Sequence, residues 1–402
     1  MPNSILTIDM ITRELMLRLE NNLTFTKYVN RNYNDHFAMT GAKIGDVVTI
    51  RLPPFFVGRT GRVINIEPLT EQSIALTLDT QYGVDLDFTS KDMLLSIDDF
   101  GERLLQPAAA NIANKIDRDG LALYNQIFSA AGTPGSSMTF LQYLNSGALL
   151  DEQSVPRDGL RSMVIGPRQQ ANIVDVLKGL FHSSTEIEEQ YKQGTMGLTG
   201  GYKWSMDQNI ANHTVGALGG TPLVNGASQT GASLITDGWT ASVTNILLKG
   251  DIFTVTGVNS VNPMSKGDNG QLQQFVVTAN QSSSAGGAVT IPISPSITTS
   301  GAYQTVTASP ADNAALTILG TAATVYNQGM AFHRDAFVLG TADLPLPMGT
   351  HQASRISDDQ LGISVRMIWD YDVTNDLFVA RTDVLYGWVV ARPQMACRIV
   401  GN

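Results

Sequence analysis

One long stretch, residues 96–131, constrains the fold more than any other part of the chain. Apolar residues recur along it every three or four positions, at Phe100, Leu104, Ala108, Ile112 and Ile116 and again at Leu123, Ile127 and Ala131. This spacing predicts a helix with one continuous apolar face. At 1.5 Å per residue, such a helix would be about 50 Å long. A compact small domain has little room for a helix of that length.

Both ends of this stretch carry helix boundary signals. Ser96 stands three residues before Asp99, a spacing that favours an N-terminal cap, and Gly132 and Pro134 favour a stop. Pro107 removes one backbone hydrogen bond, so we expect a bend there or a division into two helices. Taken alone, the stretch indicates only a long core helix in an α+β protein.

Composition points to a polar surface with few charges and much β structure. The 402 residues suffice for two or three domains, 37 of them are glycine, and only 15% are charged. Soluble domains usually carry roughly 25% charged residues. We therefore expect many strands and turns around cores of substantial size.

Charge and cysteine content exclude several classes of function. The net charge is −10 and no run of Lys and Arg occurs, so tight nucleic-acid binding is not expected. Cys397 is the single cysteine, which excludes an intrachain disulfide and a cysteine-based metal site. No signal peptide and no apolar run of 18 residues occur, so we expect a soluble protein made in a reducing cytoplasm, with no membrane partner.

The N-terminal region combines a helix with an irregular tail. Residues 5–23 place Ile8, Ile11, Leu15 and Leu19 on one helical face, and the following residues lack periodicity. The segment is either a packed terminal helix or an arm that reaches a neighbouring subunit.

A long hairpin precedes the helical stretch. Residues 45–52, 73–79 and 82–90 are predicted strands, and the connection after the first carries two aromatic residues, two glycines and two arginines. The connection is either an ordinary hairpin or a protruding loop whose arginines meet carboxylates on another molecule.

An α/β layer is predicted after the helix. Residues 161–165 form a short buried strand, and Gly166-Pro167 opens a helix that continues to Phe181. Residues 185–192 form a second, polar helix.

From His213 to Ala323 the composition changes to Gly, Ser, Thr, Val and Asn. Helical periodicity disappears, and the predicted strands are 232–237, 242–250, 251–259, 274–280 and 287–294, with turns at Asn225-Gly226 and Asn269-Gly270. Short strands at nearly regular spacing predict an antiparallel sandwich or small barrel, inserted as a separate domain.

The host composition returns near Tyr326. Alternation places Ile363, Val365, Met367 and Trp369 on one face of a strand, and residues 381–400 close the chain with one or two long strands. The whole chain is therefore predicted to be α+β, with a sheet completed by the C-terminus.

No catalytic, cofactor or metal site is predicted. The five histidines have no metal-ligand spacing, and neither a nucleophile elbow nor a phosphate-binding loop occurs. The acids Asp370, Asp372 and Asp376 do not fit a calcium loop, because Asn375 replaces the required glycine and Arg381 replaces the final glutamate.

Several segments carry a family resemblance. They are GDVVTIRLPP before the loop, ERLLQPAAANIANKIDRDGLALYNQI, the pair HTVG and KGDIFTVTGV, and the ending RTDVLYGWVVARPQMACRIV. In this order they resemble the major capsid (coat) proteins of tailed bacteriophages with the Hong Kong 97 phage fold, in the short-tailed-phage branch with a β-barrel insertion domain.

The resemblance implies a division of the chain. It comprises an N-terminal arm (1–44), an extended loop with flanking peripheral-domain strands (45–95, the loop itself Pro53 to Gln72), a spine helix (96–132), the first part of the axial domain (133–212), an inserted all-β domain (213–323) and closing axial and peripheral strands (324–402). It also implies candidate contacts between subunits, namely Arg59, Arg62, Phe55, Phe56 and Glu67.

The implied function is self-assembly into an icosahedral shell of hexamers and pentamers. A precursor shell forms in the host cytoplasm on scaffolding protein and expands when double-stranded DNA is packaged; portal protein and an optional decoration protein are further partners. We expect no enzymatic activity and no cofactor. A covalently crosslinked shell needs a specific Lys–Asn pair. Because Lys43 lies before the loop and no lysine lies in the loop, we also expect noncovalent assembly.

Two other functions remain open on the sequence. The chain is alternatively a different virion or surface-array protein, such as a tail tube, or an enzyme with an appended β domain. An enzyme of that kind needs paired carboxylates in a cleft, and the sequence offers no such pair.

Overall fold

The computed structural model describes most of the 402-residue chain. The described residues are 8–32, 47–64, 66, 71–89, 101–177, 198–347, 352–358, 362–374 and 377–401. They fall into two compact units: unit 1 holds residues up to 51, 73–120 and 337–391, and unit 2 holds 52–72, 121–336 and 392–402. None of the helices in the described part of the chain has the length and apolar character needed to span a bilayer.

Unit 1 is built on a five-stranded antiparallel sheet. Its strands are β3 (Thr80–Thr89), β16 (Phe337–Ala342), β17 (Gln352–Asp358), β18 (Ile363–Asp372) and β19 (Leu377–Val390). The long β19 pairs with β16, β18 and β3, and β17 pairs with the far side of β18. The predicted alternation in β18 is confirmed, because Ile363, Val365, Met367 and Trp369 are all buried.

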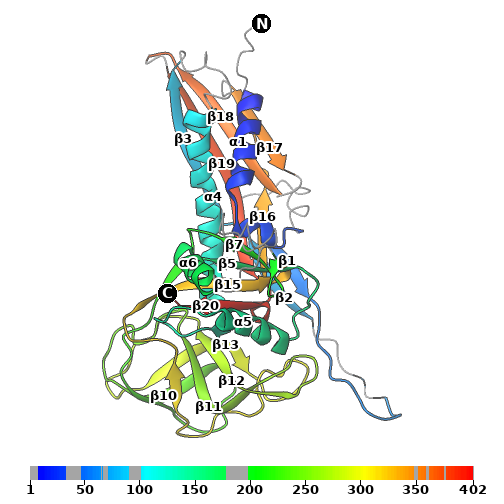
Figure 1. Cartoon of the computed structure of the whole chain (residues 1–402), viewed down its shortest axis with the longest axis vertical. Helices are drawn as coiled ribbons and strands as arrows, with labels where there is room; N and C mark the ends of the chain where they lie inside the picture. The colour runs from blue at the N-terminus through cyan, green and yellow to red at the C-terminus, as the bar shows by residue number, and fades with distance from the viewer. Residues whose placement is uncertain are drawn as a thin grey trace. The chain divides into compact units, whose positions relative to one another are not determined.

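Two helices run alongside this sheet (Figure 1). Helix α1 (Ile8–Asn22) contacts β17 and β18 with the face predicted from its spacing, since Ile11, Leu15 and Leu19 are no more than 1% exposed. The N-terminal helix is therefore packed. Most of the irregular stretch that follows it lies outside the described residues.

The long helical stretch is shorter than predicted. A π-helical turn (η3, Gly101–Leu105) leads into α4 (Gln106–Leu121), and a 3₁₀ turn (η4, Ala122–Gln126) ends it. Ala130–Ala131 forms strand β4 instead of a last helical turn. The chain must be extended there, because β4 pairs in parallel with β20 (Ala396–Val400). The predicted cap at Ser96 lies outside the described residues.

Helix α4 is anchored by a buried carboxylate. Asp117 is 1% exposed and accepts hydrogen bonds from the backbone of Thr24 at 2.7 Å and from the backbone and hydroxyl of Thr26 at 3.0 and 2.6 Å. Near its end, α4 needs a glycine, since a Cβ at Gly120 would lie 2.7 Å from the ring of Phe25. These contacts hold the segment after α1 against α4.

The host part of unit 2 is a seven-stranded mixed sheet. Its central strand β15 (Val325–His333) pairs antiparallel with β5 (Arg161–Ile165), with β20 and with β8 (Ala211–Thr214). Strand β5 pairs in parallel with β7 (Tyr202–Met206), which also pairs with β6 (Leu198–Thr199).

Two helices accompany this sheet. Helix α6 (Pro167–Leu177) connects the parallel strands β5 and β7, which confirms the predicted α/β layer, although the predicted helix at 185–192 lies outside the described residues. Helix α5 (Phe140–Glu152) was not predicted. It opens with a capping box between Thr139 and Gln142 and contacts β20 and β4.

The β-rich segment forms a closed barrel. The sheet order is β14-β11-β12-β13-β10-β9, with β9 (Gly220–Val224), β10 (Gly231–Trp239), β11 (Ile252–Val261), β12 (Asp268–Val277), β13 (Val289–Ile297) and β14 (Leu316–Ile318). An antiparallel bridge between Leu223 and Ala315 and a 2.9 Å hydrogen bond from Val224 to Ala314 join the two edge strands. This closure confirms the predicted barrel and removes exposed sheet edges.

Three predictions inside this segment are wrong in detail. Residues 242–250 form turns and not a strand, because Ser242 and Asn245 have φ of 56° and 53°. Asn269-Gly270 lies within β12, beside a register shift, and not between strands. His213 belongs to β8 in the host sheet, so the barrel segment starts later than predicted.

Replacing Asp117 by alanine tests the anchor of α4. Thr24 and Thr26 lose their carboxylate acceptor, and we expect the free energy of unfolding to fall by about 2–4 kcal/mol. Urea denaturation of the purified subunit measures the change. Asp87→Ala, on an exposed site of β3, is the control and should change it by less than about 0.5 kcal/mol. Equal unfolding midpoints for both variants would contradict the anchor.

Candidate functional site

The extended loop between β1 (Val47–Leu52) and β2 (Gln72–Thr77) carries the predicted contact residues. The two strands pair, so the predicted hairpin is confirmed. Arg59 and Arg62 are exposed, and the guanidinium of Arg59 donates to the carbonyl of Gly61. Glu67 and Lys43 lie outside the described residues.

The loop also exposes apolar side chains that the sequence reasoning did not single out. Val63, Ile64 and Ile66 are 84%, 75% and 86% exposed, and Phe56 is 57% exposed. Large apolar side chains this exposed and this close in sequence are typical of surfaces that contact another molecule. These apolar residues lie close to the two arginines in the sequence, and this proximity could have identified them as candidate contact residues.

Phe55, at the base of the loop, already has partners in its own chain. Its ring lies 5.8 Å from the ring of Tyr303 in an edge-on arrangement, and the ammonium of Lys266 lies 5.5 Å from its centre. Its predicted role between subunits stays a prediction.

Pro107 is the second residue of α4, and it is exposed. A proline ring clashes with the carbonyl four residues earlier in an α-helix. The π-helical turn that ends at Leu105 relaxes this constraint, because its hydrogen bonds span five residues. The helix therefore changes geometry directly before Pro107, and a bend at this point stays a prediction.

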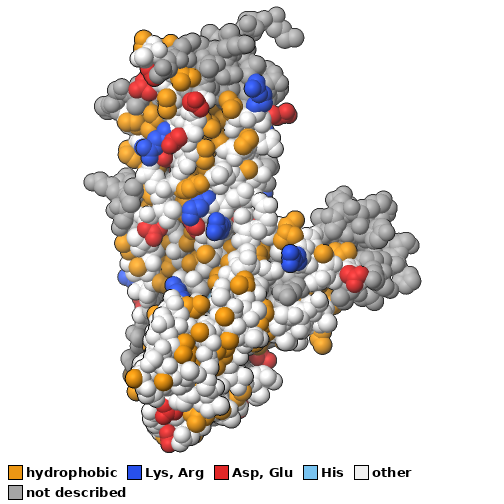
Figure 2. All heavy atoms as spheres, turned by 90° about the vertical axis from the view of Figure 1, so that its left-hand side faces the viewer, with side chains coloured by type: hydrophobic (Ala, Val, Ile, Leu, Met, Phe, Trp, Pro, Cys, Tyr) orange, Lys and Arg blue, Asp and Glu red, His pale blue; other side chains and the backbone are white. Residues whose placement is uncertain are grey.

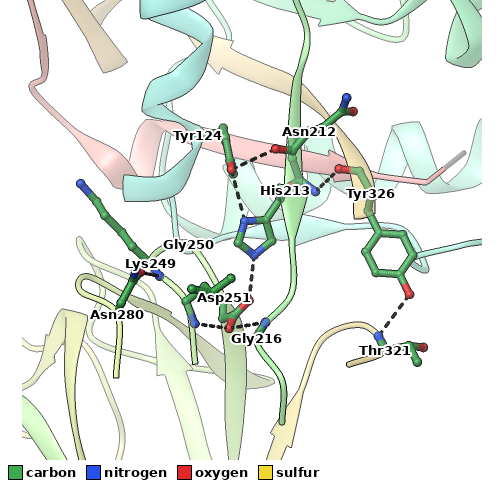
Figure 3. Close-up of polar contacts among 12 residues, drawn as sticks. Tyr124, Asn212, His213, Gly216, Lys249, Gly250, Asp251, Asn280, Thr321 and Tyr326 are labelled. Atoms are coloured by element: carbon green, nitrogen blue, oxygen red, sulfur yellow. Dashed lines mark hydrogen bonds and ion pairs between the residues drawn. The ribbon is translucent and has the colours of Figure 1, made fainter. Parts of the chain in front are cut away.

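A second group of polar residues lies at the root of the barrel, where the chain leaves the host sheet after β8 (Figure 3). Asp251 is 1% exposed and accepts hydrogen bonds from the backbone of Leu248 at 2.7 Å and of Gly216 at 3.1 Å. The Nε2 atom of His213 lies 2.8 Å from its other oxygen. Because a carboxylate only accepts, Nε2 carries the proton in this pair.

Residues of the host sheet complete this network. The hydroxyl of Tyr124 lies 3.2 Å from Nδ1 of His213, and burial raises the pKa of Tyr124, so the phenol stays neutral. Arg398 of β20 is 2% exposed, donates to the carbonyl of Gly250 at 2.7 Å and lies over the Tyr124 ring. Burial lowers the pKa of Arg398 to about 10, which leaves the guanidinium charged at neutral pH.

Further contacts join the barrel to the host sheet. The side-chain amide of Gln274 in β12 bonds to both the N–H and the carbonyl of Ala130, at 2.7 and 3.0 Å, as a neighbouring strand would. Around it an apolar cluster buries Phe128, Val215, Ile252, Val276 and Tyr326. The root is therefore a packed joint with buried polar contacts.

The arrangement is suited to mechanical connection. Within the described residues, no group of three or more His, Cys, Asp or Glu side chains could hold a metal ion. Burial raises the pKa of Cys397 to about 12, so its thiol stays protonated and unreactive at neutral pH. On the face shown in Figure 2 the barrel carries few charged side chains, which suits broad protein contacts.

Comparison with known proteins identifies the class. The family model described as "P22 coat protein - gene protein 5" matches residues 3–401. The chain belongs to the P22 coat protein family. It is a major capsid protein, with a structural role in a self-assembled virion shell.

Solved structures show more distant similarity. A structure from Mycobacterium phage Che8 is 12% identical, with a TM-score of 0.45, and covers 94% of this chain and 90% of its own. The capsid structure of cyanophage P-SCSP1u is 9% identical, with a TM-score of 0.41 and coverage of 89% and 84%. The CUS-3 coat protein I-domain is 29% identical over 27% of this chain and 98% of its own, with a TM-score of 0.17. Among curated proteins nothing matched.

Asp251→Ala tests the root of the barrel. The variant leaves the N–H groups of Gly216 and Leu248 and the proton of His213 without their acceptor, so we expect a loss of about 2–4 kcal/mol in the free energy of unfolding. Chemical denaturation of the full chain measures it. Asp237→Ala is the matched control, because the half-buried Asp237 of β10 makes no side-chain hydrogen bond to the described residues. A comparable loss in the control would refute the assignment.

Proposed function

We propose that this major capsid protein assembles noncovalently, as hexamers and pentamers, into a closed icosahedral shell. The precursor shell forms in the host cytoplasm on scaffolding protein and expands when double-stranded DNA is packaged. Portal protein, and a decoration protein where one is present, complete the particle. Membership of the P22 coat protein family supports this assignment.

The exposed apolar part of the extended loop carries the proposal. Val63, Ile64 and Ile66 keep at least three quarters of their surface exposed within their own subunit, although burying such side chains is favourable by about 25 cal/mol per Å². A neighbouring subunit that covers the loop recovers this free energy. The loop is therefore a contact between subunits.

Charge favours the same function. With 15% charged residues, large interfaces form without desolvating many ions, and a net charge of −10 keeps packaged DNA from adhering to the protein.

Electron micrographs of purified particles test the assignment. Closed shells are the expected result. Tubes or flat sheets would favour the alternative of a tail tube or surface-array protein and would overturn the proposal.

The double variant Arg59→Glu with Arg62→Glu tests the loop contact. Reversing two exposed charges at a subunit interface opposes association, so we expect at least tenfold fewer particles by sedimentation, with unchanged circular dichroism of the subunit. Arg168→Glu with Lys249→Glu makes the same charge change at exposed sites outside the loop and serves as the control. Normal assembly of the loop variant would remove the arginines from the interface.

The barrel segment is proposed to be an autonomous domain. Its first and last residues lie side by side, because Val215 donates a hydrogen bond to Thr324 and Ala323 donates one to Gly216, both at 3.0 Å. The isolated fragment 216–323 should therefore show β-type circular dichroism and a cooperative thermal transition. A disordered fragment would disprove its autonomy.

A further inference from the structure

A cavity of about 380 Å³ lies in unit 2 where the base of the extended loop meets the barrel. Phe55 of the loop, Gln153 and Gln394 of the host part, and Lys266, Thr298 and Tyr303 of the barrel segment contribute to its lining. No described residue of the lining carries a carboxylate. The lining is therefore mainly apolar and aromatic, with a few neutral polar side chains and one cation, Lys266.

Lys266 supplies the positive charge. It is one of two lysines in the segment 213–323, which has no arginine, and its ammonium donates to the carbonyls of Pro263, at 2.6 Å, and Ala302. An ammonium group has three protons, and beyond these two carbonyls Lys266 has no oxygen or nitrogen acceptor among the described residues, only the Phe55 ring, whose centre is 5.5 Å away. Burial lowers the pKa of Lys266, and no nearby carboxylate opposes this shift.

The turn that carries Lys266 is held in place. Asn262 accepts hydrogen bonds from the backbone of Met264 at 2.9 Å and Ser265 at 3.0 Å, and it donates to the carbonyl of Glu152, at the end of α5, at 3.1 Å. The hydroxyl of Ser154 donates to the same Asn262 at 2.9 Å. The position of the lysine is therefore set by the fold before any partner arrives.

Other polar groups of the lining are also available. The side chains of Gln153, Thr298 and Gln394 make no hydrogen bonds to the described residues. One cation with neutral amide and hydroxyl donors matches a single carboxylate. A phosphate backbone would need clustered basic residues, which the cavity lacks.

We propose that this cavity binds the carboxylate of an aspartate or glutamate from a second copy of the chain. The proposal rests on the self-assembly described above. The chain has 36 acidic and 26 basic residues, so neighbouring copies present carboxylates in excess. Pairing Lys266 with one of them satisfies its third proton and its charge at the contact between copies.

Zero-length carbodiimide crosslinking of assembled particles tests the pairing, because it joins an amine to a carboxyl only when the two are in contact. Particles are assembled from a mixture of nitrogen-15-labelled and unlabelled subunits and analysed by mass spectrometry. We expect Lys266 linked to an Asp or Glu of a differently labelled subunit, and no such link in unassembled subunits.

Other crosslinking results overturn the proposal. Links from Lys266 to its own subunit or to a different protein contradict a second copy as the occupant, as does the absence of any Lys266 link in particles that are crosslinked elsewhere. A lack of closed particles in micrographs would instead contradict the assembly function itself, and this proposal with it.

Variants give a second measurement. Lys266→Met removes the charge at similar length, and we expect the subunit concentration required for assembly to rise about tenfold, with Lys266→Arg recovering part of the loss. Lys249→Met is the matched control, since Lys249 is the exposed lysine of the same barrel segment. Equal assembly by Lys266→Met and Lys249→Met would overturn the proposal, because Lys266 would then only stabilise the turn of its own chain.

Discussion

The fold of unit 2 depends on the buried carboxylate of Asp251. A chain that leaves a sheet, forms a barrel of six strands and returns must satisfy its backbone groups at the point of departure. Asp251 does this by accepting from Gly216, Leu248 and His213 together. Arg398 compensates the same buried region with positive charge, and its bond to Gly250 ties β20 to the barrel root. Two opposite charges, far apart in sequence, therefore secure one joint.

This joint and the extended loop have different mechanical characters. The root combines polar bonds with an apolar cluster, so the barrel is packed firmly on the host sheet. The loop has a base packed on Tyr303 and Lys266 and a more distal part that exposes Val63, Ile64 and Ile66. A loop with a fixed base and an exposed apolar part is suited to contacting a neighbouring subunit in a defined position.

Periodic elements were largely predictable, and irregular ones were not. The apolar faces of α1, α4 and β18 follow from side-chain spacing, because burial of one face repeats with the geometry of the helix or strand. Residues 242–250 were predicted as a strand because they include the apolar Ile246 and Leu247. Both side chains are buried in the barrel core, but they reach it from turns. Helix α5 was missed although Thr139 and Gln142 form a capping box. An apolar residue indicates that its side chain is buried, but it does not indicate whether the backbone at that position is a strand, a helix or a turn.

The sequence alone determined the class of protein: an α+β host, a β-rich segment with few charges and a loop with two arginines, in the order found in tailed-phage coat proteins. Only the tertiary structure decided which charges act together. Asp251 and Arg398 lie 147 positions apart, and Lys266 meets Phe55 across 211 positions. No local pattern encodes such pairs, because strand order and register bring them together. The end of the long helix has the same origin, since pairing of β4 with β20 makes the chain extended where its own spacing favours a helix.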